Sequence, residues 1–125
     1  MPKVSKESAA QVELHGPVED RHEDVEGYTI NFLRFNVDVD GTPLLDGLPE
    51  NRCNCPHWGY MLKGRMTYRF ADHVEVIEAG DAFYVPPGHV PVVEAGSEFV
   101  QFSPAEALQA VSTVLLENAR KLQMV

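Results

Sequence analysis

Short runs of alternating apolar and polar residues fill the middle of the chain. In residues 28–35, large apolar side chains alternate with Thr29 and Asn31, and aromatic and β-branched types dominate, which is typical of a strand. Turn signals such as Ala79-Gly80-Asp81 separate further runs of this kind. These runs cover residues 58–62, 65–70, 74–77, 83–85, 90–93 and 99–102. Strands this short at this spacing predict an antiparallel sandwich or barrel over residues 28–103.

The first 27 residues follow another pattern. They are polar and rich in Asp and Glu, which favours an acidic N-terminal arm in solvent. The alternative is a short strand around Val12 to Leu14 that lies along a sheet edge.

The last segment, residues 104–125, changes to helical spacing. Ser103-Pro104-Ala105-Glu106 has the pattern of a capping box, with serine as the N-cap and proline at the first helical position. The apolar residues that recur at helical spacing are Leu108, Val111, Leu115 and Leu122. We therefore expect one helix near 104–122, part of the same domain, docked on this barrel or on a neighbouring copy.

Composition and charge exclude several classes of function. The chain has 125 residues, 44% of them hydrophobic, enough for one small domain with its own core. Its 19 acidic and 10 basic residues give a net charge of −9, which disfavours nucleic acids and anionic membranes as partners. No run of apolar residues predicts a membrane helix or a signal peptide, so we expect a cytoplasmic protein. Outward-facing aromatic positions, Trp58 and Tyr60, together with the helix stripe favour a homodimer.

The candidate chemistry lies in Cys53-Asn-Cys55-Pro-His57. Alternate side chains of an extended strand point the same way, so Cys53, Cys55 and His57 could share a face, and His89 could approach from another strand. Two thiols and two imidazoles form a zinc set by type, although the spacing is not that of a zinc ribbon or finger. Met61 has the same parity as His57 and would line the same pocket.

Two glycine turns then indicate a family. Gly80-Asp-Ala-Phe-Tyr-Val-Pro86-Pro-Gly88 and Tyr60-Met-Leu-Lys-Gly64 resemble the second motif and the end of the first motif of small single-domain cupins. The resemblance implies an all-β fold: a jelly-roll-like antiparallel β-barrel, often dimeric, here followed by one C-terminal α-helix.

The usual ligand positions of that family are replaced in this chain. Cupins commonly bind iron or manganese with three histidines and a glutamate. Counted back from Gly64, the glutamate position holds His57, and the two histidine positions hold Asn51 and Cys53. The histidine expected after Gly88 is Pro91, and His89 lies two residues before it.

Two interpretations of the replaced site remain open. In one, Cys53, Cys55, His57 and His89 hold one divalent metal ion, and these softer ligands favour zinc over iron or manganese. In the other, the site is metal-free, the cysteines are small buried hydrophobes and the histidines form hydrogen bonds within the pocket. Both place a small-molecule pocket at His57, His89, Cys53, Cys55 and Met61. The function that follows is binding of a small molecule in the barrel pocket, non-catalytic or of unknown activity; the alternative is a metal-dependent small-molecule enzyme of the oxygenase, isomerase or lyase type.

Overall fold

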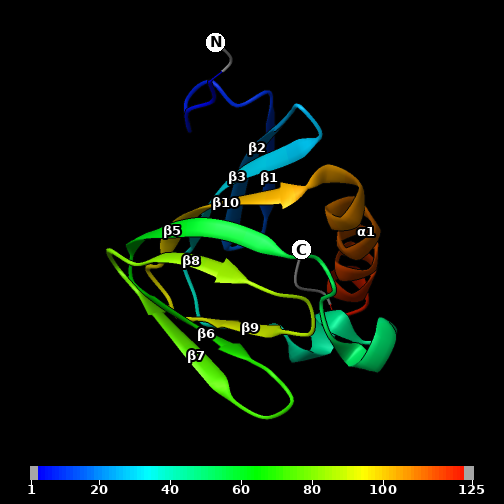
Figure 1. The fold of residues 1–125 in the computed structure, drawn as a ribbon. Coiled ribbons are helices and arrows are strands. Elements are labelled where there is room, and N and C mark those ends of the chain that lie inside the picture. The colour runs from blue at the N-terminus through cyan, green and yellow to red at the C-terminus, as the bar shows by residue number, and fades with distance from the viewer. Residues whose placement is uncertain (1–2, 123–125) are drawn as a thin grey trace.

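The computed structural model describes residues 3–122, which form two antiparallel sheets and one long helix (Figure 1). The elements of the described residues are β1 (Gln11–His15), β2 (Val18–Val25), β3 (Tyr28–Phe35), β4 (Val39–Asp40), the 3₁₀ helices η1 (Thr42–Leu45) and η2 (Pro49–Asn51), β5 (His57–Lys63), β6 (Arg65–Arg69), β7 (Val74–Glu78), β8 (Ala82–Val85), β9 (Val90–Val93), β10 (Glu98–Pro104) and α1 (Ala105–Lys121).

The strands form a six-stranded sheet in the order β1-β2-β3-β10-β5-β8 and a four-stranded sheet in the order β4-β9-β6-β7. All strand pairs between the named strands are antiparallel. The predicted antiparallel barrel with one C-terminal helix is therefore confirmed, and each strand predicted between residues 28 and 102 is present.

The main core lies between the two sheets. Strand alternation points every second side chain inward, so in β6 Met66 and Tyr68 are buried while Arg65 and Arg69 are exposed. The buried residues of this cluster are Met61, Met66, Tyr68, Phe83, Val85, Val93 and Phe99. Each such side chain stabilises the fold by about 1.5–3 kcal/mol relative to an exposed position.

Residues 11–25 are not the expected solvated arm. β2 pairs with β3 along its whole length, from Val18 opposite Phe35 to Val25 opposite Tyr28, and β1 pairs with β2 as the edge strand. Glu26 and Gly27, both with positive φ, form the tight turn between β2 and β3. This hairpin was not predicted, because the turn lacks the usual Asn or Asp and the two strands are rich in acidic residues.

α1 begins one residue later than predicted, and the prediction of a capping box is wrong. Pro104 is the N-cap and no side chain caps the helix. Ser103 belongs to β10 instead. Val111 is buried against Leu45, so the apolar stripe packs on its own barrel, although Leu122 at its end is 49% exposed. No helix among residues 3–122 combines the length and the apolar character needed to cross a membrane.

The side chain of Asn118 links α1 to the segment around η1. Its side-chain amide donates to the carbonyl oxygens of Leu44 and Asp46, at 2.8 Å each. This residue is buried, and the two bonds hold η1 against the helix.

Gly64 forms the tight turn between β5 and β6. Its φ is +79°, a conformation that favours glycine, and a Cβ at this position would lie 2.4 Å from Oγ of Ser97. The closing glycine of the first motif is therefore required both by the backbone and by the close approach of Ser97.

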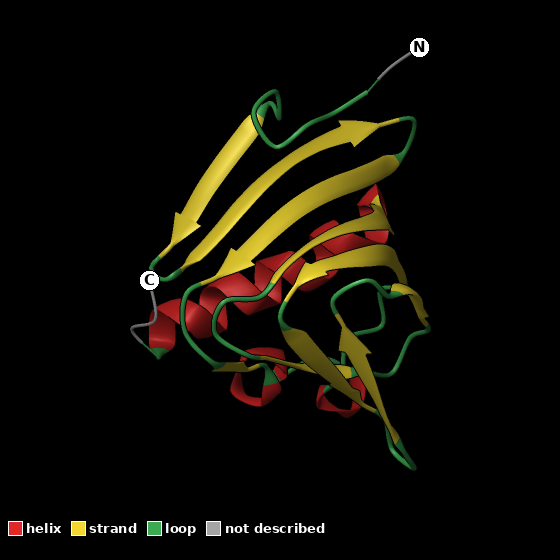
Figure 2. Cartoon of the chain, turned by 90° about the vertical axis from the view of Figure 1, so that its left-hand side faces the viewer, coloured by secondary structure: helices red, strands yellow, loops and turns green. Residues whose placement is uncertain are grey.

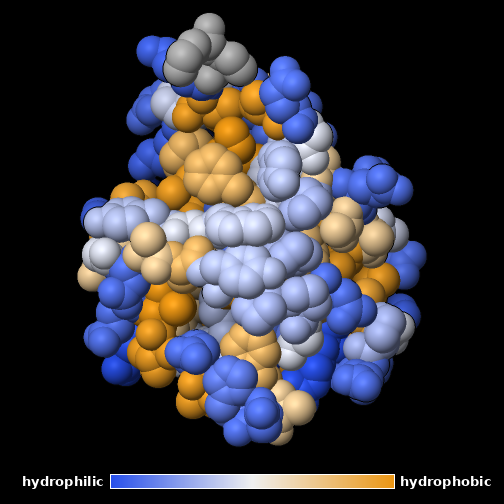
Figure 3. Space-filling view, viewed as in Figure 1, coloured by the Kyte–Doolittle hydropathy of each residue, from blue (hydrophilic) through white to orange (hydrophobic). Residues whose placement is uncertain are grey.

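A patch of aromatic side chains covers the outer face of the six-stranded sheet. Tyr28 and Trp58 are in edge-to-face contact, with ring centroids 6.3 Å apart. On the other side of Trp58 lies Tyr84, whose ring centroid is 5.0 Å from that of Trp58. Trp58 and Tyr60 are 43% and 44% exposed, so neither belongs to the core. In Figure 3 a band of pale, weakly polar side chains crosses the middle of the molecule over β5 and β8.

Candidate functional site

Three of the four predicted ligand residues come together inside the barrel. One potential ligand atom each from Cys53, His57 and His89 lies within 4.8 Å of the other two, and all three residues are buried. They come from three segments: the chain before β5, the first residue of β5, and the residue just before β9.

A backbone bridge sets Cys53 opposite His89. The N–H of Cys53 donates to the carbonyl of His89 at 2.9 Å, and the N–H of Gly88 donates to the carbonyl of Cys53 at 2.8 Å. Gly88 has a φ of +96°, the turn conformation that leads the chain into this bridge. Directly opposed residues of an antiparallel pair present their side chains on one side, so the thiol and the imidazole converge.

Each imidazole has one ring nitrogen held by an oxygen atom. Nδ1 of His57 lies 2.7 Å from Oγ of Ser103, and Nδ1 of His89 lies 2.7 Å from the carbonyl oxygen of Pro86. A carbonyl oxygen can only accept, so Nδ1 of His89 donates and Nε2 keeps its lone pair. Nε2 of His57 lies 3.9 Å from Sγ of Cys53. Metal-binding histidines are usually oriented by such a bond at the other nitrogen.

Burial keeps the cluster uncharged. It lowers the pKa of His57 to about 3, with a smaller contribution from neighbouring His89, and it also lowers the pKa of His89. Burial raises the pKa of the Cys53 thiol to about 11. At pH 7 both imidazoles are therefore neutral and can donate a lone pair, whereas a metal ion would have to displace the thiol proton.

Cys55 and Met61 do not join this cluster. The chain from Asn54 to Pro56 is not a strand, so the alternation expected through Pro56 is lost. Cys55 is fully buried in one apolar cluster with Cys53, Leu45 and Val111, and burial raises the pKa of its thiol to about 12. Met61 is fully buried in the core between the sheets. Both cysteines are free thiols.

Other residues around the cluster were not predicted. The ring of His89 is in edge-to-face contact with Tyr68 and with His57, at centroid distances of 5.1 Å each. Ser103 was interpreted as a helix cap, and the alternation of β10 is the signal that would have placed its hydroxyl inside the barrel.

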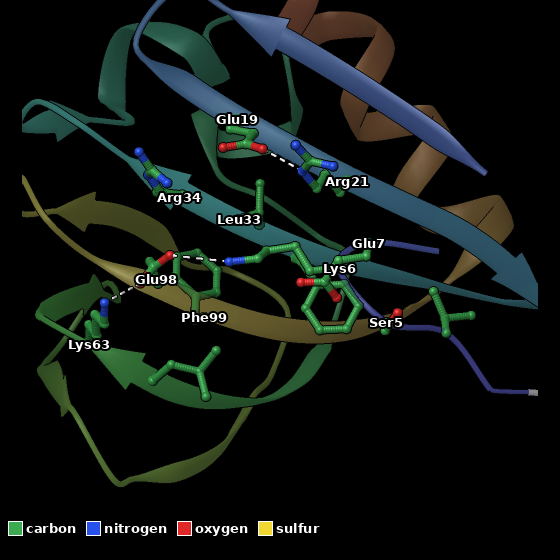
Figure 4. A pocket seen from close by; sticks show the side chains of 13 residues that line it. Ser5, Lys6, Glu7, Glu19, Arg21, Leu33, Arg34, Lys63, Glu98 and Phe99 are labelled. Atoms are coloured by element: carbon green, nitrogen blue, oxygen red, sulfur yellow. Dashed lines mark hydrogen bonds and ion pairs between the residues drawn. The ribbon is translucent and has the colours of Figure 1, made fainter. Parts of the chain in front are cut away.

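One cleft lies on the outer side of the six-stranded sheet, where the N-terminal segment crosses it (Figure 4). Its volume is about 660 Å³, and charged side chains line it. These groups neutralise one another: Arg21 pairs with Glu19, and Lys63 pairs with Glu98 at 3.2 Å. None of the three cluster residues lines this cleft.

Comparisons with known proteins place the fold. No protein-family model and no curated protein matches the sequence. Several solved structures are similar. A Rhizobium leguminosarum protein of unknown function is 16% identical with a TM-score of 0.59, over 82% of this chain and 95% of that one. An RmlC-like cupin from Shewanella frigidimarina is 17% identical with a TM-score of 0.56, over 81% and 88%.

The polyketide cyclase RemF from Streptomyces resistomycificus is also similar, at 16% identity and a TM-score of 0.56, over 83% of this chain and 79% of that one. Likeness at this level of identity shows the fold alone. Together with the two glycine turns and the sheet order, it shows that the chain has the cupin fold, as the sequence motifs predicted.

Proposed function

We propose that the chain is a small-molecule-binding cupin barrel whose site is built on one divalent metal ion held by Cys53, His57 and His89. The observation that carries this proposal is the convergence of their ligand atoms within 4.8 Å. It is supported by the two Nδ1 contacts at 2.7 Å, which direct Nε2 of each imidazole away from its oxygen partner.

The donor set suits zinc better than iron or manganese. One thiolate and two neutral imidazoles are softer than the oxygen-rich sets that manganese prefers. Ligand atoms around a tetrahedral zinc ion lie about 3.3–3.8 Å apart, given bond lengths of about 2.0–2.3 Å. The sulfur of Cys53 and Nε2 of His57 are 3.9 Å apart, so a shift of a few tenths of an ångström would bring them into range.

Three protein ligands leave one position of a tetrahedral ion for a small molecule. His57 is 6% exposed and His89 is 1% exposed, so the group that reaches this position must be small or carried on a narrow end of the ligand. A neutral, apolar surrounding strengthens the attraction between a bound cation and an oxygen or nitrogen donor of that molecule.

Cobalt substitution tests the metal site. Co²⁺ added to the metal-free protein should give a sulfur-to-cobalt charge-transfer absorption in wild type and in Cys55→Ser, because the thiol of Cys55 is outside the cluster. Cys53→Ser should lose this absorption. Equal spectra for wild type and Cys53→Ser, or loss in Cys55→Ser alone, would refute the assignment.

One feature favours a metal-dependent enzyme as the alternative function. Structural zinc sites usually have four protein ligands, whereas catalytic sites keep one position open, and this cluster offers three. An oxygenase, isomerase or lyase built on this site should lose metal-dependent turnover in His57→Ala. A ligand that binds the metal-loaded protein and is recovered unchanged supports the binding function instead.

The outer aromatic patch supports a homodimer. Tyr28, Trp58 and Tyr84 form a continuous row of rings, and Phe102, 40% exposed, lies beside Trp58 on the neighbouring strand. Aromatic side chains are enriched in protein interfaces, and a two-fold pair can cover the same patch on both copies.

A further inference from the structure

A cavity of about 590 Å³ lies between the inner face of β1, β2 and β3 and the helix α1. Figure 2 shows the helix crossing this side of the three strands. Cys53, His57 and His89 do not line it, so it is distinct from the candidate metal site. Its volume is in the range of about 300–1,000 Å³ that is usual for small-molecule sites. One wall is polar and belongs to the strands, and the opposite wall is largely apolar and belongs to α1.

The polar wall presents a buried acceptor without a partner. The side-chain amide of Asn31 donates to Oδ1 of Asp20 at 2.9 Å, which fixes the amide nitrogen toward that carboxylate. Oδ1 of Asn31 is buried and makes no hydrogen bond, and the residue as a whole is only 4% exposed. A buried acceptor left without a hydrogen bond destabilises the protein. A hydrogen-bond donor on a bound molecule would remove that penalty.

Neighbouring donors on this wall are already engaged. The hydroxyl of Thr29 donates to Oδ1 of Asp24 at 2.6 Å. The ring nitrogens of His22, which also lines the cavity, face carboxylates of the same wall: Nδ1 lies 3.4 Å from Oδ1 of Asp20, and Nε2 lies 3.7 Å from Oε1 of Glu13. The side chains of this wall therefore offer acceptors more than donors to a ligand.

The permanently charged residues of the lining are all acidic. Acidic residues line the cavity at Glu13, Asp20, Asp24 and Asp38, and no lysine or arginine is among its described lining residues. These carboxylates do not converge on one point, since Cys53, His57 and His89 are the only metal-type group found among the described residues. The field therefore favours a cation, but the spacing favours an organic cation over a metal ion.

The helix supplies the surface for an apolar body. Leu108, Leu115 and Leu116 of α1 line the cavity, and Phe35 lines it from β3. We propose that this cavity binds an amine with an apolar body: the protonated amino group donates to Oδ1 of Asn31 beside Asp20, and the body packs on the leucines of α1. This second site extends the proposed function and does not depend on the metal.

Matched probes test this chemistry. 2-Phenylethylamine, 2-phenylethanol and 3-phenylpropionate share a phenyl group and differ in charge. Calorimetric titration of the full chain should give millimolar or tighter binding for the amine, with the alcohol about tenfold weaker and the carboxylate weaker still. Amide shift changes in the NMR spectrum should map to β2, β3 and α1.

Three variants locate the site. Asn31→Leu removes the acceptor and should weaken amine binding by about tenfold or more. Asn36→Leu is the matched control, because Asn36 is exposed and does not line the cavity. Ser112→Trp places bulk in the cavity from α1 without touching the polar wall, so it tests the site if Asn31→Leu does not fold.

The outcomes separate this proposal from the metal site. Amine binding that is lost in Asn31→Leu or Ser112→Trp but retained in His57→Ala supports the second site. The proposal is overturned by equal binding of the carboxylate, by unchanged amine binding in folded Asn31→Leu and Ser112→Trp, by shift changes confined to the outer aromatic patch, or by no binding of the amine at millimolar concentration.

Discussion

Oγ of Ser103 lies 2.7 Å from Nδ1 of His57, and this contact joins the end of β10 to the first residue of β5. The hydroxyl orients the imidazole whose other nitrogen faces Cys53. Ser103→Ala should therefore lower zinc affinity by about 10–100-fold while the fold persists. Competition with a chromophoric chelator measures the affinity, and Ser8→Ala, at an exposed serine, is the control. Unchanged affinity in Ser103→Ala would show that the contact has no role in metal binding.

Acid should destabilise the metal-free protein through its buried imidazoles. The pKa of His57 falls from 6.5 to about 3 on burial, so the unfolded chain takes up a proton below pH 6.5 that the folded chain does not. Stability from this group is present above pH 6.5 and is lost as the pH falls toward 3, by about 1.4 kcal/mol per pH unit. The pKa of His89 is lowered in the same direction.

Urea unfolding between pH 7 and 5 measures this loss. His57→Gln should reduce the slope by about 1.4 kcal/mol per pH unit. His73→Gln is the control, since the side chain of His73 is half exposed. An identical slope in wild type and His57→Gln would contradict the prediction.

Removal of metal should lower the melting temperature. A metal ion that binds the folded chain and not the unfolded chain stabilises it by about 2.7 kcal/mol at a free concentration one hundred times Kd. Excess chelator should therefore lower Tm in wild type and in Cys55→Ser, and should leave Tm of Cys53→Ser unchanged. A chelator effect of equal size in all three proteins would place the metal elsewhere.

Gly64→Ala should destabilise the protein more than Gly47→Ala. Both glycines have positive φ, which costs an alanine about 1–2 kcal/mol, but only the Cβ at position 64 would meet another atom, Oγ of Ser97 at 2.4 Å. Gly47 has nothing within 4 Å of the added Cβ. Urea unfolding of the two variants measures how much further the clash with Ser97 lowers the free energy of unfolding. Equal losses of free energy in both variants would show that Ser97 moves aside freely.

Substitution in the aromatic patch should separate a dimer. Trp58→Ser removes the central ring of the row and should shift the mass measured by light scattering from about 28 kDa, twice 13.9 kDa, toward that of one chain. Val74→Ser is the control, because Val74 is 57% exposed on the other sheet. A wild-type mass near 13.9 kDa at micromolar concentration would refute the dimer.

Alternation and turn residues predicted most of the fold, because most strands from Tyr28 onward bury one face against the other sheet. They failed at β2, where half-buried polar residues such as Asp20 pair with the neighbouring strand, here with Asn31, since the pattern of β2 then resembles solvent-exposed chain. The candidate cluster followed from residue type and strand parity, to which the family motifs were then added. Cys55 was misassigned because Pro56 interrupts the strand, and Ser103 because a strand end and a helix start share the same residues.

The bridge between Cys53 and His89 has a consequence for folding. These two residues lie at the two ends of the segment that contains β5, β6, β7 and β8. A zinc ion bound to both would act as a removable cross-link that closes this segment into a loop. In the chain-entropy account, a permanent link of this span restricts the unfolded chain by about 4 kcal/mol. If the metal also bound the unfolded chain, it would hold the two ends of this segment together and shorten the search for the β-pairings of the barrel. The refolding rate, rather than the unfolding rate, would then depend on the metal concentration.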